Sequence, residues 1–464
     1  MQRLLQLYKT WCGQEPADME QIPKSGSNRH YFRLTRLGGG SVIGVVNHDV
    51  EENRCFVYLS KHFSERHLPV PEILAVSDDG SCYLQTDLGR QSLYDALRMG
   101  RDSGGSYSER ETALVSSVIR LLPHLQVEGA DGLDEQCLLS PNVFNEQAAM
   151  FDLNYFKYCF LKTTDLAFNE VALQTDFDRF ASDLVCVAGM PADYAGQPIK
   201  TFLYRDFQAR NVMLRQADAS PCFIDFQGGQ IGPLQYDLAS FLWQASARYP
   251  QMLRETMIGE YLAELHQICS FDEDAFRSKL HLFVLFRILQ VLGTYGLRGY
   301  FERKTYFLNS IPPAIQNLRR QLLDGVCISY PYLEGVLQRM VDLPQFQSPD
   351  VARTGRGVMY NVSRCYKTVY LPFPSHTLYI YAIKVQIQIQ AVAASALSLR
   401  RQRFRAKTVQ DIRQCTRRKR QRHRIGLRPH TRHFQSDGHQ PKRPLCSPCQ
   451  CRRFVDGCVL HDWI

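Results

Sequence analysis

The sequence predicts an α+β fold with a small β-rich lobe, a large helical lobe and a basic tail. Before residue 89, short β-branched runs alternate with turns, and after it the apolar residues recur with helical spacing. The balance of charges then changes near residue 350. We therefore expect three parts, residues 1–88, 89–350 and 351–464.

Length and composition indicate a folded protein of several units. The chain has 464 residues, of which 45% are hydrophobic and 22% are charged. At roughly 100–200 residues per domain, this length predicts about two to four compact units, and the composition excludes a wholly disordered, collagen-like or small disulfide-rich chain. The sequence lacks both a run of about 18 uncharged apolar residues and the apolar stretch of a secretory signal. We therefore expect a cytoplasmic protein without a membrane partner.

The first part predicts a mostly antiparallel lobe. Three consecutive glycines at 38–40 indicate a tight turn between two extended runs, and the Asp-Asp-Gly sequence at 78–80 indicates a second one. The expected elements are a segment 25–34 that begins with turn-forming residues and continues as a strand, strands at 41–46, 73–76 and 81–86, and a helix at 53–62.

Helical spacing dominates from residue 90 onward. Ser108 and Glu111 have the spacing of a capping box, which satisfies free amides at a helix start. We expect two short strands between the helices, at the apolar runs 201–204 and 222–226. Further helices are expected at 151–161, 177–188, 236–248, 252–268, 274–297 and 312–323.

The two strand-like runs each lead into a loop with polar side chains that suit phosphoryl transfer. Asp206 and Asn211 follow the first run, and Asp225 lies at the end of the second. Phosphoryl transfer needs metal ions on the phosphates and an oriented hydroxyl, and Mg²⁺ takes only one or two oxygen ligands from protein in such sites. Asp206 suits a proton acceptor, while Asn211 and Asp225 suit magnesium. A capped turn is the alternative explanation for the pair Asp206 and Asn211 alone.

These loops resemble a known family. The segments Arg205–Asn211, Asp225–Gln227, Gly232–Pro233 and Tyr236–Ser240 are similar to those of the aminoglycoside phosphotransferase/choline kinase family, which has a protein-kinase-like bilobal fold. Within it, the chain resembles bacterial anomeric kinases of N-acetylmuramate and N-acetylglucosamine over roughly residues 5–345. The resemblance implies ATP as donor, Asp206 as catalytic base, and Asn211 and Asp225 as Mg²⁺ ligands. It also implies that Asp237 braces the catalytic loop.

The same resemblance implies a nucleotide site in the small lobe. Ser25, Gly26, Ser27, Asn28 and Arg29 would form the loop over the ATP phosphates, and Gln85 and Asp87 would belong to the hinge near adenine. Taken without the resemblance, the segment 25–28 is also typical of an ordinary hairpin turn.

The sequence departs from the family pattern at two places. Tyr204 stands where a histidine usually precedes the Arg-Asp pair, and the strand at 41–46 contains no lysine for the phosphates. Lys24, Arg29 and Arg33 are candidates for the missing charge, and a solvated surface role is the alternative for each.

The expected function is transfer of the ATP γ-phosphate to a hydroxyl of a small molecule, with an amino sugar as the expected acceptor. The alternatives are another small alcohol (an aminoglycoside, choline or a nucleoside), or an RNA-binding regulator with a kinase-like ligand sensor. For acceptor contacts the helical lobe offers several polar residues, although helix caps or surface ion pairs explain them equally well. They are Glu146, Asp152, Asn154, Tyr155, Arg287 and Arg298.

The tail differs from the rest of the chain. Residues 351–464 hold 23 of the 55 Lys and Arg residues but only 4 of the 46 Asp and Glu residues. Such a basic segment is expected to be disordered or to contact RNA phosphates. Cys446, Cys449, Cys451, Cys458 and His461 offer an irregular zinc pattern. Relatives with this kinase-like domain are sometimes followed by a domain resembling the C-terminal part of the RNase adaptor RapZ, which residues 351–464 do not resemble. The composition break suggests a shift of reading frame near residues 355–360.

Overall fold

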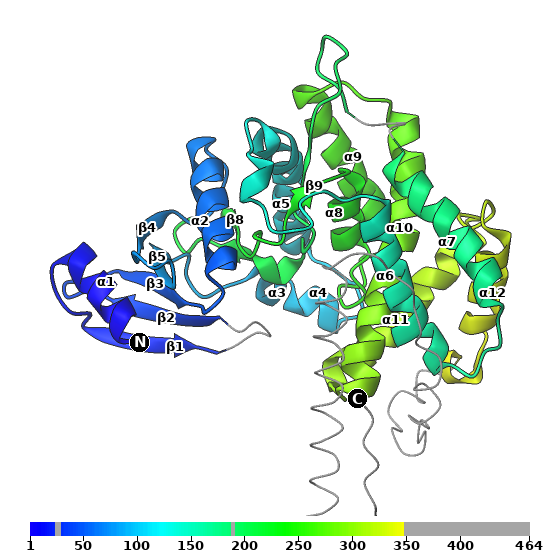
Figure 1. Ribbon diagram of the computed structural model, residues 1–464, viewed down its shortest axis with the longest axis horizontal. Helices are drawn as coiled ribbons and strands as arrows, with labels where there is room; N and C mark the ends of the chain where they lie inside the picture. Colours follow the sequence, from blue (N-terminus) through cyan, green and yellow to red (C-terminus); the bar gives the residue numbers. More distant parts are fainter. Residues whose placement is uncertain (24–28, 187–190, 348–464) are drawn as a thin grey trace, which may run out of the picture. The chain divides into compact units, whose positions relative to one another are not determined.

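The computed structural model describes residues 1–23, 29–186 and 191–347, which Figure 1 shows in colour. These residues form a five-stranded antiparallel sheet, followed by a mostly helical part. This is the small and large lobe arrangement of a protein-kinase-like fold. The expected RNA contact, zinc pattern and shifted frame all fall on residues 348–464, outside the described part.

The sheet has the strand order β1-β2-β3-β5-β4. Each neighbouring pair is antiparallel, and Ile43 lies between Arg33 on one side and Gln85 on the other. Odd-numbered residues of the central strands therefore share one face of the sheet. The strands are β1 Asp18–Ile22, β2 His30–Thr35, β3 Ser41–Val46, β4 Ile73–Val76 and β5 Cys82–Thr86.

Two helices cover opposite faces of this sheet. Helix α1 (Gln2–Cys12) packs its buried residues Leu4 and Tyr8 against the face with Leu34 and Leu84. The approach is close at Gly44, where a β-carbon would lie 2.8 Å from a methyl group of Leu4. Helix α2 (Val50–Glu65) packs on the other face, beside the strands in Figure 1.

The helical lobe has its core around α10 (Glu273–Tyr295), which packs against α6, α8 and α11. With its π-helical continuation to Phe301, α10 is the one helix in the described ranges long and apolar enough to cross a membrane. Of its most apolar window, 61% is buried inside the protein. A helix that is apolar on all sides is typical of a protein core.

The other helices surround α10. Ser108 and Glu111 form the predicted capping box at the start of α5. The α-helices are α3 Leu93–Ala96, α4 Arg98–Asp102, α5 Glu109–Val127, α6 Glu146–Cys159, α7 Glu170–Val185, α8 Gln235–Leu242, α9 Gln251–Ile268, α11 Thr305–Leu323 and α12 Pro331–Val341. Short 3₁₀ turns lie at Glu128–Ala130, Glu135–Cys137, Leu161–Thr163, Ala209–Asn211 and Pro344–Phe346, and the π-helical turn at Gly296–Phe301.

Two small antiparallel pairs position the loops of interest. Strand β6 (Phe202–Leu203) pairs with β9 (Gln230–Ile231), and β7 (Val212–Leu214) pairs with β8 (Pro221–Phe223). The loop with Asp206 therefore leaves β6 and enters β7, while the loop with Asp225 leaves β8 and enters β9.

Several predicted boundaries were wrong. The first predicted strand begins at His30, and β1 and α1 were not predicted. Helix α8 ends at Leu242, because side chains of Arg254 and Asn317 donate to the carbonyls of Leu242 and Trp243 at 3.0 and 3.2 Å, which satisfies the helix end. Helix α11 begins before its two prolines rather than at Pro312.

Candidate active site

Asp237 of α8 holds the loop that follows β6. Its carboxylate accepts hydrogen bonds from the backbone amides of Tyr204 at 2.8 Å and Arg205 at 2.9 Å, and from the side chain of Gln126 at 2.9 Å. Arg205 has a φ of 71°, which lies in the left-handed region and is uncommon for a residue with a side chain. Burial raises the pKa of Asp237 to about 6 although these donors favour its charged form. The contacts match the bracing role that the family resemblance implied.

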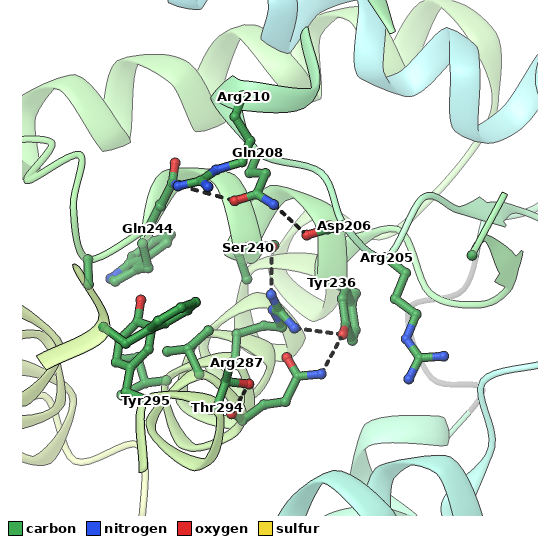
Figure 2. Close-up of a pocket in the computed structure, with 18 of the residues that line it drawn as sticks. Arg205, Asp206, Gln208, Arg210, Tyr236, Ser240, Gln244, Arg287, Thr294 and Tyr295 are labelled. Atoms are coloured by element: carbon green, nitrogen blue, oxygen red, sulfur yellow. Dashed lines mark hydrogen bonds between the residues drawn. The ribbon is translucent and has the colours of Figure 1, made fainter. Parts of the chain in front are cut away.

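Asp206 follows directly and faces a cavity. The side-chain amide of Gln208 donates to its carboxylate at 2.7 Å, and the amide of Asn211 donates to its backbone carbonyl at 2.9 Å (the first bond is drawn in Figure 2). Desolvation by the surrounding protein raises the pKa of Asp206, and the nearby charge of Asp225 raises it further. A carboxyl group whose pKa is raised in this way is better suited to accept a proton.

The two loops are joined through their backbones. The amide of Ile224 donates to the carbonyl of Asn211 at 3.0 Å, and the Tyr204 hydroxyl donates to the carbonyl of Ile224. Tyr204 is fully buried, so it occupies the usual histidine position as a structural hydrogen-bonding residue. The structure therefore brings together Asp206, Asn211 and Asp225, the three residues predicted from the sequence.

Aromatic packing fixes the second loop against the small lobe. Phe226 stacks on Phe56 of α2 with ring centroids 4.9 Å apart, and it contacts Phe63 and Tyr204 edge-on. Asp225 precedes it with a φ of 67°. This packing ties the orientation of Asp225 to the position of α2.

Asp225 and Asn211 retain oxygen atoms that suit a metal ion. The Oδ1 atom of Asp225 accepts from Gln227 at 3.0 Å and lies 3.4 Å from Arg29, whereas its Oδ2 atom accepts no hydrogen bond from the described residues. The Oδ1 atom of Asn211 likewise accepts none from them. No cluster of three or more His, Cys, Asp or Glu side chains suited to a metal occurs in the described part, but Mg²⁺ at phosphate sites needs fewer protein ligands than this.

The structure describes only some of the residues predicted for the nucleotide site. Ser25, Gly26, Ser27 and Asn28 lie outside the described residues. Arg29 is described, and its guanidinium group is buried between Glu52 and Asp225.

The two hinge residues differ in what they offer a ligand. Gln85 is buried, and its Oε1 atom has no hydrogen-bond partner among the described residues. The Asp87 carboxylate is fully engaged, because Arg33 donates to it at 2.5 Å and Ser41 at 2.6 Å. Burial alone would raise the pKa of Asp87, but these donors hold it below its ordinary value. Any nucleotide contact of Asp87 is therefore expected from its backbone.

A cavity of about 390 Å³ lies beside Asp206 (Figure 2). This volume falls in the range of small-molecule sites. Its wall combines aromatic, amide and guanidinium groups from the catalytic loop, α8, α10 and α11. The principal lining residues are Arg205, Asp206, Gln208, Arg210, Tyr236, Ser240, Trp243, Arg287, Gln290 and Tyr306.

Arg287 presents a cation to this cavity. It donates to the hydroxyl groups of Tyr236 at 2.7 Å and Ser240 at 2.8 Å, as Figure 2 shows. Within the described ranges it forms no ion pair with a carboxylate. Asp152 lies behind it and accepts from Gln290 at 2.9 Å. Burial raises the pKa of Asp152, although Arg205 and Arg287 oppose this.

Of the six acceptor candidates, only Arg287 lines the cavity. Asp152 reaches it indirectly through Gln290, and Arg298 pairs with Glu302 at 2.6 Å. Glu146, Asn154 and Tyr155 lie on α6 outside the cavity wall. Sequence reasoning assigned no acceptor role to a further set of lining residues, because a polar or aromatic side chain in a helix or loop gives no local signal of a cavity. These are Gln208, Tyr236, Ser240, Trp243, Gln290 and Tyr306.

Three features define a small-molecule kinase with a protein-kinase-like fold. They are the small antiparallel sheet, the braced loop whose aspartate faces a cavity, and the second aspartate on the adjoining loop. Residues 161–277, which contain both loops, match the phosphotransferase enzyme family, APH. Kinases of this family use ATP.

Two relatives share most of their length with this chain. The N-acetylmuramate/N-acetylglucosamine kinase of Neisseria meningitidis serogroup B is 25% identical over 335 residues, which cover 69% of this chain and 91% of the relative. The kinase of the same name from Pseudomonas putida is 24% identical over 304 residues, covering 65% and 82%. The chain is thus distantly homologous to these enzymes.

Solved structures of low identity are also similar. Choline kinase from Cryptosporidium parvum has a TM-score of 0.44 at 13% identity and covers 69% of this chain and 93% of its own. Ethanolamine kinase from Plasmodium vivax has a TM-score of 0.43 at 11% identity, covering 65% and 82%.

Proposed function

We propose that this kinase transfers the γ-phosphate of ATP to a hydroxyl group of an amino sugar. The observation that carries the proposal is the position of Asp206, which lines a cavity of about 390 Å³ and lies next to the loop of Asp225. A hydroxyl bound in the cavity would meet a carboxylate whose pKa is raised by burial. The proton of the attacking hydroxyl would pass to Asp206 as the bond to phosphorus forms.

Asn211 and Asp225 would hold Mg²⁺ through the oxygen atoms that accept no hydrogen bond from the described residues. Mg²⁺ neutralises charge on the phosphates of the bound nucleotide. The contribution of the chain is to fix both side chains, through the Ile224–Asn211 backbone bond and through the stacking of Phe226 on Phe56.

The charges of the cavity favour a neutral or anionic acceptor. Arg205, Arg210 and Arg287 line it together with a single carboxylate, that of Asp206. Aminoglycosides and choline are cations, so this lining opposes them electrostatically. An amino sugar agrees with the names of the two relatives, and the carboxylate of N-acetylmuramate would find a partner in Arg287.

A turnover assay with Mg·ATP and a panel of acceptors tests the proposal. The panel is N-acetylglucosamine, N-acetylmuramate, glucose, kanamycin, choline and uridine, with ADP release and product mass as readouts. We expect phosphorylation of the amino sugars and little of the cations. Turnover of kanamycin or choline in preference to sugars would overturn the choice of acceptor. RNA binding by residues 1–350 without any turnover would instead support the regulator.

A further inference from the structure

The nucleotide phosphates need a cation that the usual strand does not supply, because the segment 41–46 contains no lysine. Among the three candidates from the sequence, Lys24 lies outside the described residues. Arg33 is committed elsewhere: it donates to both carboxylate oxygens of Asp87, at 2.5 and 3.0 Å, and to the carbonyl of Gly89 at 2.8 Å. Of the two candidates that the structure describes, Arg33 and Arg29, this leaves Arg29.

Arg29 precedes β2 and links three elements of the site. Its Nη2 atom lies 2.6 Å from Glu52 Oε1 on α2, and its Nη1 atom lies 3.4 Å from Asp225 Oδ1. The Nη1 atom also donates to the Tyr31 hydroxyl at 3.3 Å. The guanidinium is fixed, because its side chain is only 1% exposed and it lies 6.0 Å from the ring of Phe56.

The charges around Arg29 are suited to holding a cation in a buried place. Burial alone would lower its pKa, but Tyr31, Tyr83 and Glu52 raise it above the ordinary value, so the guanidinium remains charged. Glu52 is itself placed by α2, and the Phe56–Phe226 stack connects α2 to the loop of Asp225. The position of this cation relative to Asp225 is therefore set by packing.

We propose that Arg29 contacts the phosphates of the bound nucleotide in place of the missing strand lysine, and that Glu52 is its positioning residue. The inference rests on the proposed function, in which Asp225 would hold Mg²⁺ at the nucleotide phosphates. A guanidinium group 3.4 Å from Asp225 would be within reach of phosphate oxygens bound there, and its planar fork suits two such oxygens.

The rival explanation is that Arg29 only ties the small lobe to the loop of Asp225. The two explanations differ in how affinity depends on phosphate. Loss of a phosphate contact weakens the binding of ADP but not of adenosine. Loss of a purely structural contact changes the shape of the whole nucleotide site and weakens the binding of both ligands.

Calorimetric titration of the full chain with ADP and with adenosine, both without metal, separates them. Arg29→Met should weaken ADP binding about 10- to 100-fold, the range for a lost charge-assisted contact, and change adenosine binding less than about twofold. Arg29→Lys keeps the charge and should recover part of the ADP affinity. Glu52→Gln should also weaken ADP binding more than adenosine binding, but by a smaller factor than Arg29→Met. Arg90→Met, which removes a guanidinium paired with Glu20 on the surface, is the matched control and should change neither ligand.

Parallel weakening of ADP and adenosine, or unchanged ADP affinity in Arg29→Met, would overturn the inference. If Arg29→Met does not fold by circular dichroism, Arg29→Lys and Glu52→Gln decide by the same ADP-to-adenosine ratio. Wild-type protein that binds neither ligand, even with Mg²⁺ present, would remove the proposed function and this inference together. Intact ADP binding by the Arg29 variants would remove the inference alone.

Discussion

Asn211 secures Asp206 through the backbone, because its side-chain amide donates to the Asp206 carbonyl at 2.9 Å. The carboxylate instead accepts from Gln208 and faces the cavity. The groups that hold the backbone of this loop are therefore different from the carboxylate that would accept a proton. The backbone is held by Asn211 and Asp237, so a change in the Asp206 side chain should alter proton transfer with little effect on the fold.

Replacing Asp206 with asparagine should reduce kcat by about 10²- to 10⁴-fold, the usual contribution of a general base. Asparagine has nearly the same shape and still accepts from Gln208, but it cannot take a proton. The KM for ATP should stay within about twofold. Steady-state kinetics with an accepted sugar measure both quantities. Asp218→Asn, at an exposed acid in the turn between β7 and β8, serves as control, and an Asp206→Asn enzyme with wild-type kcat would exclude Asp206 as the base.

Replacing Asp225 with asparagine should raise the Mg²⁺ concentration needed for half-maximal ADP binding by about tenfold or more. The change removes the charge of a proposed ligand but keeps its shape, so binding of ADP without metal should be affected much less. Titration of Mg²⁺ at fixed ADP, followed by calorimetry, gives this value directly. Asn211→Ala should act in the same direction, with an added loss of kcat because it also frees the Asp206 carbonyl. A metal requirement unchanged in both variants would argue against these ligands.

The buried carboxyl of Asp237 should make stability depend on pH. Its pKa is raised by burial to about 6 in the folded protein, above the ordinary value of 3.8. The folded state therefore binds more protons between these values, and the contribution of Asp237 to the free energy of unfolding should fall as pH rises from about 4 to 6. Urea unfolding at a series of pH values measures this slope.

Asp237→Asn supplies the comparison. It should be less stable at pH 7 by about 1–3 kcal/mol, because its side chain has one acceptor oxygen in place of two and cannot accept from both backbone donors, Tyr204 and Arg205. It should also lack the part of the pH slope that belongs to Asp237. Equal slopes in the two proteins would show that Asp237 does not titrate in this range.

The sequence predicted the loops of the site better than its cavity. Asp206 and Asp225 could be found because each follows a short, fully apolar strand, which is a local signal. Ser240 and Gln290 could not, because they meet only when α8 packs on α10, and each alone resembles a helix surface residue. Contacts of this kind depend on tertiary packing, which a single sequence does not display.

A similar limit explains the missed elements of the small lobe. Strand β1 lies at the sheet edge, and its five residues are exposed or half-buried, so it carries no buried apolar face to detect. Helix α11 was shortened in the prediction because Pro312 and Pro313 suggested a helix start, whereas the helix continues through them. Packing against α10 therefore outweighs the low helix propensity of the two prolines.

The boundary expected near residue 350 leads to a prediction about the tail. All buried apolar residues of the described part lie at or before Val341, within the core of the two lobes. A protein ending at residue 350 should therefore keep the melting temperature and sugar kinase activity of the full chain. Scanning calorimetry and the turnover assay measure these. A large loss of either would show that residues 351–464 support the lobes.

Arg287 offers a test of the acceptor that does not disturb nucleotide binding. Its guanidinium group lines the cavity and bonds only to the neutral hydroxyl groups of Tyr236 and Ser240 among the described residues. If it meets the carboxylate of N-acetylmuramate, Arg287→Met should raise the KM for this sugar about tenfold or more and change that for N-acetylglucosamine much less. Arg298→Met, on the π-helical turn that follows α10 but outside the cavity, is the matched control. Equal effects on both sugars would mean that Arg287 only supports Tyr236 and Ser240, and that the acceptor carboxylate, if any, binds elsewhere.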